Sequence, residues 1–142
     1  MTTIRLAWTA LDCPDPFALA SFYSALTGLA IEPLGDLAPD EVTWLELVNP
    51  AGPTVAFQKV AVFVAPTWPE GGVPQQAHLD FFVGDLDEGE ALARSLGATV
   101  HSFQPGGTFF RVFLDPAGHP FCLVQRAEPS PPVASERLSV TV

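Results

Sequence analysis

Apolar and polar residues alternate at the start of the chain and then change to a helical spacing. Residues 4–11 predict a strand, and Asp15 followed by Pro16 can supply the N-cap and first turn of a helix. Apolar residues continue at helical spacing as far as Gly28, where a left-handed C-cap fits. The beginning of the sequence therefore predicts a strand followed by a helix.

Two further strands are predicted around a tight turn. Residues 42–48 and 55–64 have strand character, and the segment between them, Asn49-Pro50-Ala51-Gly52, is typical of a turn. Residues 66–74 hold several prolines and the pair Gly71-Gly72, so they are expected to form an irregular crossover.

The second half of the chain repeats this order. We expect a strand over residues 77–83, a helix over 87–96 capped by Asp85 and closed by Gly97, and hairpin strands over 109–114 and 121–125. The hairpin turn Asp115-Pro116-Ala117-Gly118 matches the first turn at an offset of 66 residues. The sequence thus predicts two copies of a strand-helix-strand-strand-strand unit, which must pair to cover their sheets.

Composition limits the size of the fold and its partners. The 142 residues suit one domain, and 48% hydrophobic against 15% charged residues indicates a sizeable core. Six Lys and Arg against sixteen Asp and Glu give a net charge of −10, which argues against nucleic acid and anionic membranes as partners. The start lacks the pattern of a signal peptide. We therefore predict a cytoplasmic protein, and in that location Cys13 and Cys122 are expected to be free thiols.

Several segments resemble a known family. They are Ser21-Phe22-Tyr23 with Leu26-Thr27-Gly28-Leu29, residues 77–83 leading into Asp85-Leu86-Asp87, Leu96-Gly97-Ala98, and residues 115–124. Together they resemble the glyoxalase-like branch of the vicinal oxygen chelate superfamily, over about residues 4–126. The resemblance implies an α+β fold in which two paired βαβββ modules form a curved mixed sheet around a cavity. The expected parts are module 1 (about 4–64), a crossover (65–76), module 2 (about 77–126) and a C-terminal tail (127–142).

The resemblance also implies four metal-ligand positions, on the first and last strand of each module. Trp8 occupies the first position, and Gln58 or Ala56, two residues before it on the same strand face, occupies the second. His78 occupies the third position and Cys122 the fourth. An indole offers no lone pair, and hard cations need carboxylates, so only His78 keeps a usual ligand type. We therefore expect no metal and no other cofactor.

Other residues can complete the predicted site. Asp80 shares a strand face with His78, where it can act as an oxygen ligand or accept a hydrogen bond from the imidazole. Phe82 lies on the same face as an apolar wall. Counting back across the hairpin turn pairs Arg111 with Cys122, which makes Arg111 an anchor for an anionic group if it faces the cavity.

Some side chains keep two interpretations. His78 is the best candidate for acid–base chemistry, or else a hydrogen-bonded core residue. Cys122 is a nucleophile only if its pKa is depressed, and is otherwise a small buried hydrophobe. Trp68 in the crossover is a cavity lid or a surface staple.

The leading hypothesis is a protein that binds a small, partly apolar molecule in an aromatic cavity without a metal, with Trp8 as a stacking face. The first alternative is a lyase, isomerase or dioxygenase of the same superfamily that uses a divalent metal or His78. The second is a domain that serves only in association. We also predict a homodimer, and a tail that packs on its own or a partner subunit.

Overall fold

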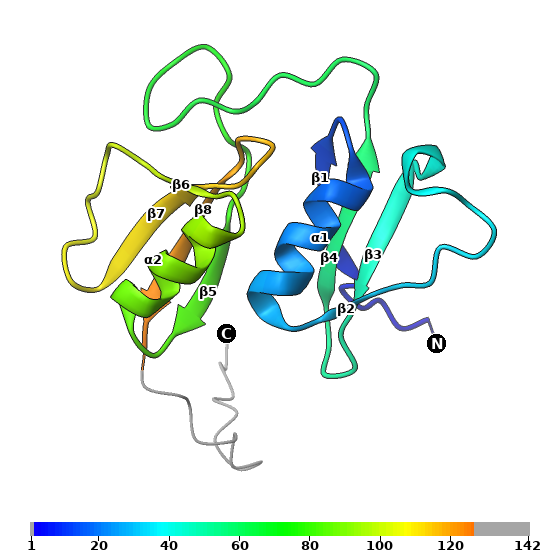
Figure 1. The fold of residues 1–142 in the computed structure, drawn as a ribbon, viewed down its shortest axis with the longest axis horizontal. Helices are drawn as coiled ribbons and strands as arrows, with labels where there is room; N and C mark the ends of the chain where they lie inside the picture. Colours follow the sequence, from blue (N-terminus) through cyan, green and yellow to red (C-terminus); the bar gives the residue numbers. More distant parts are fainter. Residues whose placement is uncertain (1, 127–142) are drawn as a thin grey trace.

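The computed structural model describes residues 2–126, which form two modules of the same build (Figure 1). The first contains β1 (Trp8–Cys13), α1 (Pro16–Thr27), β2 (Ala30–Ile31), a 3-10 turn η1 (Pro39–Glu41), β3 (Trp44–Val48) and β4 (Thr54–Lys59). The second contains β5 (Leu79–Val83), α2 (Leu86–Ser95), β6 (Thr99–Val100), β7 (Phe110–Leu114) and β8 (Pro120–Gln125).

Each module forms one mixed four-stranded sheet. The strand order is β1-β4-β3-β2 in the first sheet and β5-β8-β7-β6 in the second. The first and last strands of each module pair in parallel, and the remaining neighbours are antiparallel. This repeated arrangement confirms the predicted α+β fold of two βαβββ modules.

Strand bounds differ from the prediction because the hydrogen-bonded ladder limits them. The β1–β4 ladder runs from the pair Trp8 and Thr54 to the pair Cys13 and Lys59. The predicted strands over 4–11 and 55–64 extend beyond both ends of this ladder, where the chain has no strand partner. Apolar residues outside the ladder therefore do not lengthen the strands, and Ile4 and Val62 are exposed.

The predicted helix signals are found in place. The Asp15 carboxylate accepts a hydrogen bond from the amide of Ala18 at 3.0 Å, and Asp85 accepts one from Glu88 at 2.9 Å. Gly28 ends α1 with φ 79°, the left-handed conformation that glycine adopts without strain.

Helix α1 joins the two modules into one core. The ring of Tyr23 stacks on Phe57 of β4 and also contacts Phe81 of β5 and Phe121 of β8. The Tyr23 hydroxyl donates a hydrogen bond to Asp115, in the β7–β8 turn, at 2.7 Å. Because both sheets turn one face toward this helix, the opposite face of each sheet points away from the core.

No helix among residues 2–126 is long and apolar enough to cross a membrane. The prediction for the tail, residues 127–142, lies outside the described residues.

Candidate functional site

The face of the second sheet that points away from the helices carries four of the predicted site residues. His78 immediately precedes β5, Asp80 and Phe82 alternate along it, and Asp80 pairs with Cys122 of β8. The intervening Leu79, Phe81 and Val83 pack against the core. Period-two alternation therefore placed these side chains correctly.

Three of these side chains converge at one point. The His78 Nε2 atom lies 3.3 Å from Asp80 Oδ1, and the ligand-type atoms of His78, Asp80 and Cys122 all lie within 4.8 Å of one another. Burial, together with the nearby Asp80 carboxylate, raises the pKa of the Cys122 thiol to about 12. Cys122 is therefore a protonated thiol at neutral pH, and the structure favours its interpretation as a buried, unreactive side chain.

The donor set decides which metals suit this cluster. It offers one imidazole nitrogen, one carboxylate and one thiol, and Cys122 must lose its proton before it can ligate. Mg²⁺ and Mn²⁺ prefer several hard oxygen ligands, so a single carboxylate fits them poorly. A soft ion such as Zn²⁺ accepts nitrogen, sulfur and oxygen together, so these three residues would suit it.

A pocket of about 140 Å³ opens beside His78 and Cys122. Its lining is mostly aromatic, aliphatic and proline side chains, with few polar groups: Trp68, Gln75, His78, Pro105, Phe110, Val112, Pro120 and Cys122. The Gln75 Oε1 atom is buried and has no hydrogen-bond partner in the described part of the chain. This pocket therefore combines apolar walls with a glutamine side chain and an imidazole.

Trp68 shows how the crossover contributes to the pocket. Its indole lies 5.4 Å, between ring centroids, from both His101 and Phe103, which follow β6. Trp68 thus lines the pocket and also fastens the crossover to the second module. Gln75, Phe110 and Val112 were not predicted as site residues, although the correct register would have placed Val112 beside Cys122.

The predicted pairing of Arg111 with Cys122 is wrong by one residue. The structure pairs Arg111 with Leu123, and Val112 with Cys122. The ladder pairs Leu114 with Pro120 and not with His119, so five residues (115–119) separate the paired positions where four were predicted. A slip of one residue moves a side chain to the other face of a strand.

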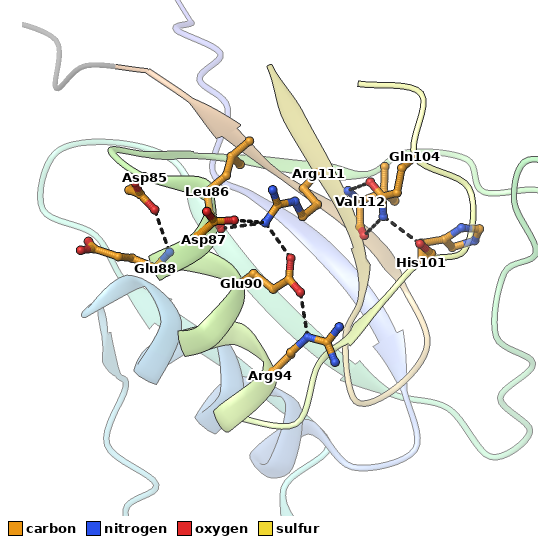
Figure 2. A network of polar contacts seen from close by, with 10 residues as sticks. All are labelled: Asp85, Leu86, Asp87, Glu88, Glu90, Arg94, His101, Gln104, Arg111 and Val112. Carbon is orange, nitrogen blue, oxygen red and sulfur yellow. Dashed lines mark hydrogen bonds and ion pairs between the residues drawn. The ribbon is translucent and has the colours of Figure 1, made fainter. Parts of the chain in front are cut away.

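Arg111 consequently lies on the helix side of the second sheet (Figure 2). Its guanidinium donates hydrogen bonds to the carbonyl of Leu86 at 3.2 Å, to Asp87 at 3.1 Å and to Glu90 at 2.6 Å. Glu90 also accepts a hydrogen bond from Arg94. Arg111 therefore ties β7 to α2 and is not a ligand anchor in the predicted cavity.

Trp8 and Gln58 lie on the uncovered face of the first sheet. Trp8 meets Trp44 edge to face, with ring centroids 5.7 Å apart. The pocket beside His78 includes neither Trp8 nor Gln58. The prediction of one cavity between Trp8, Gln58, His78 and Cys122 is therefore not met by this pocket.

Comparison with known proteins places this chain in a family. The family model of the glyoxalase-like domain matches residues 8–124. The chain belongs to the glyoxalase-like domain family. The match spans both modules, including β1 and β8, so the resemblance seen in the sequence is confirmed. No curated protein matches the chain significantly.

Solved structures show the same fold at low sequence identity. A glyoxalase/bleomycin resistance protein/dioxygenase family enzyme from Burkholderia phytofirmans PsJN matches with a TM-score of 0.62 and 16% identity, covering 86% of this chain and 98% of that one. The fosfomycin resistance protein FosX from Mesorhizobium loti gives 0.63 and 14%, covering 89% and 95%. TioX from Micromonospora sp. ML1 gives 0.58 and 16%, covering 86% and 98%.

Proposed function

We propose that this glyoxalase-like protein binds a small, partly apolar molecule in the pocket beside His78, without a metal. The observation that carries the proposal is a pocket of about 140 Å³ with apolar walls and few polar groups. A cavity of roughly 150 Å³ holds benzene in another protein. The ligand is therefore expected to present about one aromatic ring to this pocket.

Polar groups at the pocket give the ligand an orientation. The His78 imidazole is held 3.3 Å from Asp80, which favours a proton on Nε2 and leaves Nδ1 as an acceptor. The side chain of Gln75 lines the same pocket and is a second polar group there. A hydroxyl or amine on the ring would donate a hydrogen bond to the Nδ1 acceptor of His78, whereas an unsubstituted ring would not. If the protein catalyses a reaction, His78 is the side chain best placed for proton transfer.

Two probes of similar size test the proposal, phenol with a hydroxyl group and toluene without one. We expect both to shift the NMR signals of the Trp68 indole and the Val112 amide in a saturable way, phenol more tightly. His78→Ala should weaken the binding of phenol and leave the binding of toluene almost unchanged. Glu88→Ala, on the exposed surface of α2, is the matched control.

A pocket-filling variant completes this test. Cys122→Leu adds volume inside the pocket and should abolish the binding of both probes, while circular dichroism confirms that the variant folds. The proposal fails if neither probe gives saturable shifts at the pocket, or if the filled variant binds both as well as the natural protein.

The second candidate is a metal- or His78-dependent lyase, isomerase or dioxygenase. It is favoured by the three donors that lie within 4.8 Å of one another. Its test is titration with Co²⁺, whose bond to a thiolate gives a strong near-ultraviolet absorption. Stoichiometric binding that Cys122→Ser removes would support this candidate, and the absence of binding would eliminate its metal-dependent form.

We propose a homodimer in the cytoplasm as the setting for this function. β1 and β5 are each an edge strand of their sheet, and Val62 and Val64, which follow β4, are 83% and 61% exposed. Two free, buried cysteines accord with a reducing compartment. Sedimentation is expected to show a dimer that Val62→Asp weakens and that Leu92→Asp, on α2, does not. A monomer at high concentration would refute the dimer.

A further inference from the structure

The uncovered face of the first sheet contains a corner built by two indoles. Trp8 pairs with Thr54 and Trp44 pairs with Gln58, so both lie across β4 from each other, on either side of Ala56. The rings meet over this alanine at 64°, with centroids 5.7 Å apart, and Ala56 is fully buried. A larger side chain at position 56 would keep the indoles apart.

Carboxylates lie next to this corner. Glu46, which pairs with Ala56, accepts a hydrogen bond from the Trp44 indole N–H at 2.9 Å. Glu32 accepts one from the backbone amide of Glu46 at 2.8 Å, and therefore lies beside it. Asp12 shares the face, because it alternates with Trp8 along β1.

Within residues 2–126, these acidic groups have no cationic partner. The ion pairs found within residues 2–126 join His78 to Asp80, Glu90 to Arg94, and Arg111 to Asp87 and Glu90. None involves Asp12, Glu32 or Glu46. Trp8 is also 41% exposed, so one of the two rings is open to solvent beside unpaired negative charge.

We propose that this corner is a second binding site, which takes the ammonium group of a small organic cation. The exposed Trp8 indole, held edge to face against Trp44, presents a negative π-surface to a cation, and the carboxylate of Glu46 adds a full charge beside the pair. A quaternary or methylated ammonium suits this combination, because its methyl groups contact the rings while its charge is attracted to Glu46. The net charge of −10 also favours the approach of a cation.

This site goes beyond the pocket beside His78 and does not rest on it. The two sites have different walls, since the pocket uses Trp68 and the corner uses Trp8 and Trp44. The three tryptophan indole N–H signals therefore report on the two sites separately.

The test compares choline with 3,3-dimethyl-1-butanol, which has the same shape without the charge. We expect choline to shift the Trp8 and Trp44 indole N–H signals in a saturable way and to leave Trp68 unchanged. The neutral alcohol should bind at least about threefold more weakly, in keeping with the size of an exposed cation–π interaction.

Matched variants identify the groups responsible. Glu46→Gln keeps an oxygen that accepts the Trp44 hydrogen bond but removes the charge, so it should weaken choline about threefold and leave the alcohol unchanged. Glu88→Gln on α2 makes the same change in net charge away from the corner and should have no effect. Trp8→Leu should abolish the shift at Trp44.

Three results would overturn the proposal. The first is equal binding of choline and the alcohol, which would mean that shape alone matters. The second is a loss of choline binding in Glu88→Gln as large as that in Glu46→Gln, which would mean that only the net charge matters. The third is a dependence of the Trp8 and Trp44 signals on protein concentration and not on choline, which would mean that a second copy of the chain covers this face.

Discussion

The hydrogen bond between Tyr23 and Asp115 joins the two modules inside the core, and Tyr23→Phe tests its contribution. The hydroxyl donates to Asp115 Oδ2 at 2.7 Å, and the two residues are 1% and 4% exposed. The other carboxylate oxygen, Oδ1, accepts hydrogen bonds from the backbone amides of Ala117 and His119. Removing the hydroxyl leaves Oδ2 buried without this donor, while the ring still fills its place.

The expected loss follows from the charge and burial of the acceptor. Buried hydrogen bonds to charged groups contribute ~1.5–3 kcal/mol, so Tyr23→Phe should lower the free energy of unfolding by about 2 kcal/mol. For a chain of this length that corresponds to a fall in Tm of roughly 4–10 °C. Urea unfolding followed by circular dichroism measures the free energy directly.

The loss should depend on pH. Burial raises the pKa of the Asp115 carboxyl above its ordinary value, and the Tyr23 hydrogen bond opposes that rise. The folded state therefore loses stability as Asp115 ionises with rising pH, and the hydroxyl offsets part of this cost only while the carboxylate is charged. Tyr23→Phe should cost more at pH 7 than below the pH at which Asp115 takes up its proton.

Two variants control this experiment. Ser21→Ala removes a hydroxyl from the same helix, but one that bonds to the carbonyl of Phe17 within α1, so it should change stability by less than about 0.5 kcal/mol. In an Asp115→Asn background the cost of Tyr23→Phe should shrink, because the acceptor is no longer charged. A loss below about 0.5 kcal/mol at pH 7, or an equal loss in both backgrounds, would refute the reasoning.

The remaining predictions concern the thiols, the network of Figure 2 and metal content. Burial raises the pKa of the Cys122 thiol from 9.0 to about 12, so at pH 8 its thiolate is roughly a thousandfold scarcer in the folded protein than in the unfolded chain. Iodoacetamide should therefore modify Cys122 only after urea is added. Rapid labelling of the folded protein would contradict this prediction. Arg111→Ala should cost about 1 kcal/mol in urea unfolding because it releases β7 from α2, whereas Arg94→Ala, whose side chain is 60% exposed, should cost less than about 0.5 kcal/mol. Equal losses would mean that Arg111 adds no more than a surface charge. Treatment with a chelator should leave Tm unchanged; a large fall would favour the metal-dependent candidate.

Local signals in the sequence determined the elements and their order. Asp15, Pro16 and Gly28 act on groups within a few residues of themselves, so the ends of α1 follow from the sequence alone. The side-chain alternation of a strand is equally local, and for this reason His78 and Asp80 were correctly assigned to one face. The repeated turns then indicated two modules, because the same local signals occur twice in the same order.

Tertiary structure decided how these elements meet, because that depends on groups far apart in the chain. The β7–β8 ladder pairs Leu114 with Pro120, one residue beyond the predicted partner, so Arg111 turns toward α2 and Val112 lies beside Cys122. The crossover brings Trp68 to the pocket only because it packs on the loop after β6. Trp8 and Trp44 meet because β4 lies between their strands and presents a small alanine beneath them, and neither the strand order nor that contact is written in any single segment of the sequence.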